Sequence, residues 1–280
     1  MNRVLRKSPV PKEVTSPGMT ASDGQRVTGN GQQQPCDNSH VRRSLPILIG
    51  IVVLLTLAAV ITYALAFRDT ATPVDPTDLT VAGAGTLPGD PGVYRYATTG
   101  FEEIDALAGA RHDYPVETYL TIGAGACGTT ARWDALAERW VEWDHCGPGV
   151  AVTGTRGYHE WFGVPDLEHE ACPEPLPMVP AATVTVACVT GDTTETYTVT
   201  PLGAEDLVIA GETVTTDHVR IASVLTGGTT GASEVELWVL PDTVLVVKTT
   251  VERHTTSPSR IGDVHYDEVY TLVLTSLMPG

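Results

Sequence analysis

The chain has 280 residues, of which 42% are hydrophobic and 18% are charged, and it carries a formal net charge of −17 at pH 7. A protein this acidic does not bind nucleic acid by neutralising phosphates, and anionic lipid surfaces repel it. Its length is sufficient for one sizeable hydrophobic core.

Residues 1–44 are rich in Gly, Gln, Pro, Ser and Thr, with scattered basic side chains. Neither a helical nor a strand period runs through them, so we predict a disordered cytoplasmic tail. Seven Lys and Arg against three acids fall within residues 1–43, which leaves a charge of −21 for the remainder. The basic pair Arg42 and Arg43 adjoins the next segment.

Residues 45–67 form an apolar run without a charge. As a helix, this run would be about 34 Å long, enough to cross a hydrocarbon layer of about 30 Å. We predict a single transmembrane helix with the N-terminus in the cytoplasm, because basic residues precede it and acidic residues follow it. The alternative is a signal peptide cleaved after Ala64-Leu65-Ala66, but the long apolar run and the long preceding tail favour a retained anchor in the cell membrane.

Residues 68–90 are rich in Pro and Gly and are predicted to be a linker that acts as a spacer. Residues 91–280 are predicted to form an extracytoplasmic β domain, since Val, Thr and Tyr dominate and turn signals recur. Hairpin turns are expected around Gly191-Asp192, Gly211 and Pro241-Asp242. Further strands are expected at 93–100, 116–122, 150–156, 158–162 and 264–277.

The short connections between these strands predict antiparallel neighbours. The expected fold is therefore mainly β, a curved antiparallel sheet resembling a half-barrel meander. Residues 131–144 leave two alternatives open. Trp133, Leu136, Trp140 and Trp143 fall at helical spacing, which favours one short helix, whereas three Trp in a curved sheet are equally compatible with strands.

The chain contains five cysteines. Cys36 lies in the predicted cytoplasmic tail, where thiols stay reduced, and the other four lie in the predicted outer domain, where oxidation favours pairing. Three pairings are possible. We prefer Cys127 with Cys146 and Cys172 with Cys188, because each closes a short loop. A metal site or a redox pair is the alternative, although no Cys-x-x-Cys occurs.

No residue set in the sequence specifies a reaction. His159-Glu160 lacks the second His of a zinc-protease motif, no Gly-x-Ser-x-Gly occurs, and no Gly-rich phosphate loop precedes a helix. The clusters Asp144-His145-Cys146 and Glu168-His169-Glu170 are interpreted as surface His beside acids. We therefore expect no enzymatic activity, no catalytic residue, no cofactor and no metal, with a cell-envelope hydrolase as the alternative that an acid pair would support.

Aromatic side chains are the remaining candidates for a site. Most of them lie between residues 133 and 162, and they either fill the core or line an apolar cavity for a lipid or another hydrophobic ligand. The candidate ligand-facing residues are Trp133, Trp140, Trp143, Trp161, Phe162 and Trp238.

The chain resembles uncharacterised single-pass membrane proteins of high-GC Gram-positive, actinobacterial bacteria. The resemblance covers residues 91–280 and rests on 131–146, 157–163, 191–199, 235–250 and 269–277. The C-terminal sheet is also similar to half-barrel lipoprotein carriers, and that similarity implies greasy cargo on a concave face. The expected function is a membrane-anchored extracytoplasmic binding or interaction module, with a hydrophobic ligand. A structural or regulatory partner of another membrane protein is the alternative.

Overall fold

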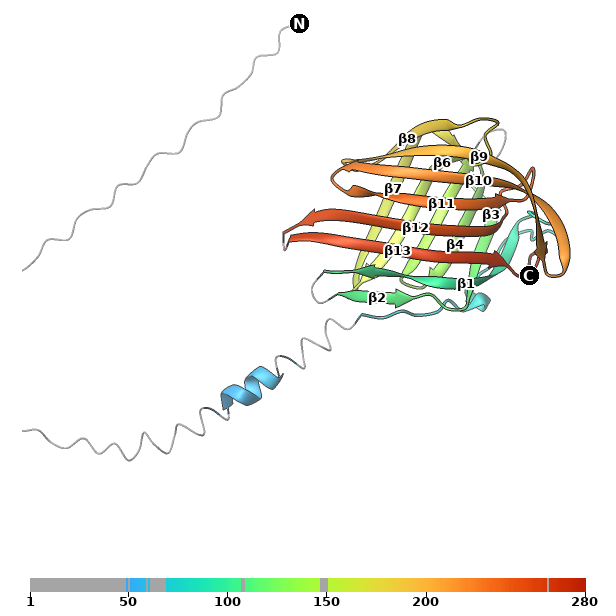
Figure 1. Ribbon diagram of the computed structural model, residues 1–280. Coiled ribbons are helices and arrows are strands. Elements are labelled where there is room, and N and C mark those ends of the chain that lie inside the picture. The colour runs from blue at the N-terminus through green and yellow to red at the C-terminus, as the bar shows by residue number, and fades with distance from the viewer. Residues whose placement is uncertain are drawn as a thin grey trace, which may run out of the picture. The chain divides into compact units, whose positions relative to one another are not determined.

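The computed structural model describes Ile49, residues 51–58, Val60, and residues 69–106, 109–146, 151–260 and 262–280 (Figure 1). The chain separates into two compact units, Met1–Leu57 and Ala58–Gly280, and all the strands belong to the second. In the part of the chain that the structure describes, no helix has both the length and the apolar character needed to cross a bilayer. The predicted tail 1–44 and most of the predicted span 45–67 lie outside the described residues.

The second unit forms one antiparallel sheet in which consecutive strands pair. A short 3-10 helix, η1 (Pro76–Asp78), precedes the strands. The strands are β1 (Gly92–Ile104), β2 (Ala110–Asp113), β3 (Glu117–Ala124), β4 (Gly128–Leu136), β5 (Arg139–Cys146), β6 (Ala151–Trp161), β7 (Val164–Pro177), β8 (Val184–Thr190), β9 (Thr193–Ile209), β10 (Glu212–Gly227), β11 (Thr230–Val239), β12 (Val246–Ser259) and β13 (Gly262–Leu274).

The sheet closes into a barrel because β1 pairs with β13, from Tyr96 opposite Leu274 to Ile104 opposite Tyr266. β2 and β3 pair with successive parts of β1, so the 13 strands occupy twelve positions around the wall. The predicted antiparallel meander is confirmed, but the open half-barrel is wrong. Closure satisfies the backbone groups that the first and last strands would otherwise expose at two sheet edges.

The helix considered for residues 131–144 is also wrong, because this segment forms β4 and β5. Trp133 pairs with Leu120 of β3 and with Val141 of β5, so it sits between two strands. Ala131, Trp133 and Ala135 are buried on one face of β4, and Asp134 and Leu136 next to them are buried as well. Pairing on both sides therefore overrides the helix-forming composition of this segment.

The predicted hairpins are confirmed. Thr190 lies opposite Thr193 across Gly191-Asp192, and Ile209 lies opposite Glu212 across Ala210-Gly211. β11 and β12 pair on either side of the Pro241-Asp242 turn. The two strands expected at 150–156 and 158–162 are one continuous strand, β6.

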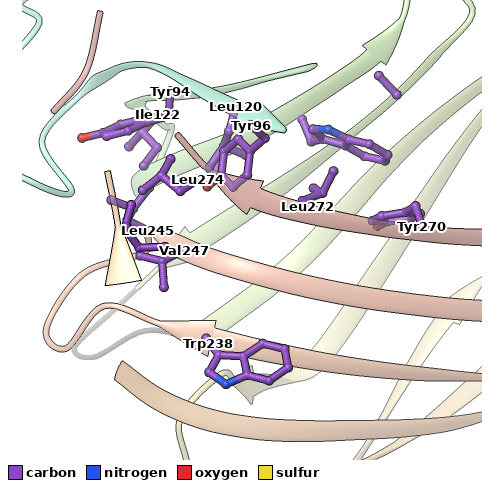
Figure 2. Packing of buried hydrophobic residues seen from close by; sticks show 14 of the residues in the cluster. Tyr94, Tyr96, Leu120, Ile122, Trp238, Leu245, Val247, Tyr270, Leu272 and Leu274 are labelled. Atoms are coloured by element: carbon purple, nitrogen blue, oxygen red, sulfur yellow. The ribbon is translucent and has the colours of Figure 1, made fainter. Parts of the chain in front are cut away.

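Because consecutive strands alternate in direction, the β4–β5, β6–β7, β8–β9, β10–β11 and β12–β13 turns gather at one end of the barrel. The other end holds the β9–β10 turn and the C-terminus (Figure 1). The second end is filled by apolar side chains. Figure 2 shows Ile122, Leu245, Val247 and Leu274 packed together there, all nearly inaccessible. We call it the apolar end, and the first the polar end.

The strand pairing in the barrel wall is weak between β7 and β8, and we call this place the seam. β7 and β8 share a single register pair in the described residues, Ala171 opposite Val189. Cys172 and Cys188 form a disulfide beside it, with Cα atoms 4.2 Å apart. Cys127 and Cys146 form the other disulfide, with Cα atoms 5.2 Å apart, so the preferred pairing is confirmed. Two disulfides are typical of a domain in an oxidising, extracytoplasmic compartment.

Candidate functional site

The barrel interior toward the polar end contains charged residues rather than apolar ones. Glu102 of β1 is fully buried and is the centre of a group that we call the Glu102 cluster. Its carboxylate lies 2.8 Å from His112 Nδ1 on β2 and 3.0 Å from His159 Nδ1 on β6. The Tyr266 hydroxyl of β13 donates to the same carboxylate at 3.1 Å. Three strands therefore place polar groups around one buried acid of a fourth.

Arg139 and Glu268 extend this cluster. Arg139 Nη2 lies 2.9 Å from Glu268 Oε1, and Arg139 Nε lies 3.5 Å from Glu102. The Tyr114 hydroxyl donates to Glu268 at 2.6 Å. Burial by itself would lower the pKa of Arg139, but the charges of Glu268 and Glu102 and of the neighbouring Tyr266 and Tyr114 together outweigh it and raise the pKa well above its ordinary value. The buried arginine thus stays charged and is paired by two carboxylates.

The two histidines determine the charge of Glu102. Burial would raise the pKa of Glu102, but the hydrogen bonds with His112 and His159, together with the charges of His159 and Arg139, outweigh burial and lower that pKa to about 2. Burial would lower the pKa of His112, but the hydrogen bond with Glu102 and the charges of Glu102 and Asp69 raise it overall. The cluster is therefore made of an ionised carboxylate and a histidine biased toward its charged form.

Residues 69–72, which we call the strap, bind the same part of the barrel. Asp69 Oδ2 lies 2.8 Å from His112 Nε2, and Asp69 Oδ1 accepts a hydrogen bond from the Phe162 backbone N–H at 2.9 Å. Thr72 donates to Glu138 in the β4–β5 turn from its backbone N–H at 2.8 Å and from its hydroxyl at 2.7 Å. The first residues of the predicted linker are therefore fixed to the barrel.

A second polar group, the Glu195 cluster, lies on β9, β10 and β12. Arg253 Nη2 lies 3.0 Å from Glu195 Oε2, and the Ser223 hydroxyl donates to Glu195 at 2.5 Å. Arg253 is directly opposite Glu268 in the β12–β13 register. The two clusters therefore adjoin inside the barrel.

Glu170 of β7 lies near this cluster but makes no ion pair with Arg253, which is paired with Glu195. Both of its carboxylate oxygens accept from the Tyr197 hydroxyl at 2.9 Å, and no ion pair involves it among the described residues. Burial, together with the nearby charge of Glu195, raises the pKa of Glu170 to about 7. Asp166 and Glu168 share the inward face of β7 with Glu170, because residues two apart on a strand point the same way.

Glu170 also lies close to the Cys172–Cys188 pair, with ligand atoms within 4.8 Å of one another. Such spacing could suit a metal, but a metal requires thiolates, and both sulfurs are consumed in the disulfide. The chemistry of this donor set does not fit a metal centre in the oxidised protein. The expectation of no metal site stays a prediction.

The six aromatic candidates are dispersed. Trp133 is fully buried in the core, and Trp143 packs against both core clusters. Trp140 stacks on Tyr158, and Trp161 stacks on His112 with ring centroids 4.1 Å apart. Phe162 lies in the β6–β7 turn, and Trp238 stacks on His218.

Two hollows open on the described surface, with volumes of about 350 and about 500 Å³. The smaller is lined by residues such as Glu103, Arg111 and Asp267, and the larger by residues such as Asp144 and Arg156. Neither is lined by any of the six aromatic candidates.

Sequence reasoning missed most of the polar interior. Glu102, Arg139 and Glu268 are distant in the chain and carry no local motif, so only the closed barrel brings them together. His159 was singled out only for a zinc motif that it lacks, yet it contacts Glu102. His145, interpreted as a surface residue, is buried, and burial lowers its pKa to about 4.

Comparison of the chain with protein-family models, with curated proteins and with solved structures gives no match to any of the three. What the barrel and its polar interior do therefore has to be inferred from their own geometry.

Proposed function

We propose that the protein is a membrane-anchored extracytoplasmic binding module, and that it binds an amine-bearing cation at the polar end of the barrel. Glu170 would pair with the ligand's charge inside the barrel. Asp166 and Glu168, exposed on the same face of β7, would attract the cation toward it. The predicted helix at 45–67 would provide the anchor.

The observation that carries this proposal is the missing partner of Glu170. The neighbouring buried acids have cationic partners: Glu102 has His112 and His159, Glu268 has Arg139, and Glu195 has Arg253. Glu170 has a hydrogen bond from the Tyr197 hydroxyl but no ion pair among the described residues, because Arg253, the cation nearby, is paired with Glu195. A partly buried acid with a pKa raised to about 7 and no ion pair of its own is typical of a functional site.

The proposed entry route follows from the contrast between the two ends. Leu245 and Leu274 at the apolar end are almost completely inaccessible, whereas the Arg253 side chain, in the Glu195 cluster, remains 28% exposed. Asp166 and Glu168 are exposed. Solvent access from the polar end supports entry of a small polar molecule there.

A hydrophobic ligand has weaker support. The apolar side chains of the interior pack against one another, and the aromatic candidates lie in separate environments. Pairing with another membrane protein and hydrolysis of cell-envelope material stay alternatives, and no specific observation favours either.

Isothermal titration calorimetry tests the proposal, with the detergent-solubilised full chain and spermidine as the amine probe. Glu170→Gln keeps the acceptor for Tyr197 but removes the charge, and we expect it to weaken binding at pH 8 by about tenfold or more. Glu212→Gln, at the exposed acid that begins β10, is the matched control and should bind as the wild type does. Equal affinity in all three proteins would contradict the proposal.

The same titration with vesicles identifies the source of the amine. Vesicles bearing ethanolamine headgroups, but not vesicles bearing only choline headgroups, should compete with spermidine if the ligand is a lipid headgroup. If neither competes, the ligand is a dissolved amine.

A further inference from the structure

The strap limits how far the barrel can lie from the membrane. Asp69 follows Phe67, the last residue of the apolar run, by only two positions. Two residues extend over at most about 7 Å. The Asp69 carboxylate is bound to the Phe162 backbone N–H at 2.9 Å and lies 2.8 Å from His112. The chain between them therefore allows the β6–β7 turn to lie no farther than on the order of 15 Å from residue 67.

The strap is held at more than one point. Beyond the two contacts of Asp69, the Thr72 backbone carbonyl accepts from the Ala137 N–H at 2.9 Å, and Thr70 and Thr72 donate to Glu138. The Glu138 carbonyl in turn accepts from the Glu160 N–H at 2.9 Å, next to the β6–β7 turn. These bonds connect the strap, the β4–β5 turn and the β6–β7 hairpin into one unit at the polar end.

The tip of the β6–β7 hairpin has the composition of a membrane-contacting turn. It reads Trp161-Phe162-Gly163-Val164, and Phe162 and Gly163 have φ values of 56° and 73°, which match the tight turns that join twisted strands. Val164 and Leu167 are each 64% exposed, although both are apolar. Aromatic and aliphatic side chains together are favoured at the boundary between lipid headgroups and acyl chains.

We propose that the β6–β7 tip, through Phe162, Val164 and Leu167, rests in the headgroup region of the outer leaflet and sets the orientation of the barrel on the membrane. This inference rests on the anchor in the proposed function. The headgroup region adds about 5–8 Å beyond each face of the hydrocarbon core, so a turn no farther than on the order of 15 Å from residue 67 can reach it. The strap would then keep the barrel close to the membrane instead of acting as a flexible spacer.

The acids next to the β6–β7 tip determine which kind of lipid surface the tip should bind. Asp166 and Glu168 follow the tip on β7, and an anionic surface would repel them. The contact should therefore be strongest on zwitterionic lipid and weaken as anionic lipid is added.

A pair of exposed valines gives a matched test in the full chain. Val164 lies at the polar end and is 64% exposed, whereas Val208, before the β9–β10 turn, lies at the apolar end and is 69% exposed. In a Cys36→Ser background, Val164→Cys and Val208→Cys are each labelled with a nitroxide, and the protein is reconstituted into phosphatidylcholine vesicles. Electron paramagnetic resonance then measures collision of each label with oxygen and with a water-soluble nickel chelate.

We expect the label at 164 to collide with the nickel chelate about threefold less than the label at 208, and with oxygen more often. Asp69→Ala combined with Glu138→Ala removes both contacts of Asp69 and the bonds that Thr70 and Thr72 donate to Glu138. It should release the tip and bring the label at 164 to the value at 208. Flotation of the protein with the vesicles tests the anchor separately. Flotation with equal collision rates at 164 and 208 would overturn the inference and leave the anchor standing, whereas loss of flotation would overturn both.

Discussion

The His112 Nδ1 atom lies 2.8 Å from the Glu102 carboxylate, and each residue is at most 1% exposed. Such burial of an acid and a base is tolerated only when both are paired, because removing one partner leaves an uncompensated charge. The Asp69 carboxylate contacts the other ring nitrogen of His112, Nε2, so this pair also holds the strap against the barrel.

Replacing His112 should therefore destabilise the barrel. His112→Ala leaves Glu102 with fewer partners and frees Asp69, and we expect the free energy of unfolding at pH 6 to fall by about 2–4 kcal/mol. His254→Ala is the control, because the side chain of His254 is 55% exposed and its loss should cost little. Urea unfolding followed by circular dichroism measures both, and equal effects would refute the role given to His112.

The same pair predicts a pH dependence. The pKa of His112 is higher in the folded protein than in the unfolded chain, where it is about 6.5. Its contribution to stability is therefore complete below pH 6.5 and is lost as the pH rises through the folded-state value. The difference in unfolding free energy between wild type and His112→Ala should shrink from pH 6 to pH 9. A difference that is constant over this range would contradict the assigned charge.

Glu170 should behave as a destabilising charge in the absence of ligand. Its pKa is raised from 4.5 to about 7 in the folded protein, so its contribution to stability is complete below pH 4.5 and is lost as the pH rises through 7. We expect Glu170→Gln to match the wild type near pH 4.5 and to be more stable by about 1–3 kcal/mol at pH 8. Chemical unfolding at the two pH values tests this, and a variant that is less stable at pH 8 would disprove it.

The two disulfides should differ in how strongly they protect the strands beside them from amide hydrogen exchange. They close loops of 16 and 19 residues, so each should stabilise by a similar amount, about 2–4 kcal/mol. Cys172 and Cys188 join β7 to β8, which share one register pair in the described residues, whereas Cys127, directly before β4, is joined to Cys146 of β5, and β4 and β5 are paired along most of their length. The double Ser variant at 172 and 188 should therefore speed amide exchange at the seam strands, and the double Ser variant at 127 and 146 should leave β4 and β5 protected. Equal protection patterns would argue against a weak seam.

Much of the wall could be predicted from the sequence because hairpins are local. Gly191-Asp192 and Gly211 supply the backbone freedom that their turns require, and alternation identifies the flanking strands. The disulfides could be predicted for the same reason, since each joins neighbouring strands. The closure of the barrel could not, because it depends on Tyr96 meeting Leu274 at the far end of the chain.

The segment 131–144 was ambiguous because Trp133, Trp140 and Trp143 satisfy a helical period as well as a sheet. The polar interior could not be predicted for a different reason. Acids are so frequent in this chain that Glu102 and Glu170 look like any surface carboxylate until the barrel encloses them. Local sequence carries no signal for burial of a charge when its partner comes from another strand.

The titration of Glu170 tests the central claim most directly. Carbon-13 NMR of glutamate-labelled full chain, with the Glu170 signal assigned by its absence in Glu170→Gln, gives the pKa of this carboxyl group without and with saturating spermidine. If Glu170 binds the amine, its pKa should be near 7 in the free protein and should fall toward the ordinary value near 4.5 when the amine binds. A Glu170 pKa that stays near 7 in the presence of spermidine and of ethanolamine-bearing vesicles would contradict a binding role for this carboxylate.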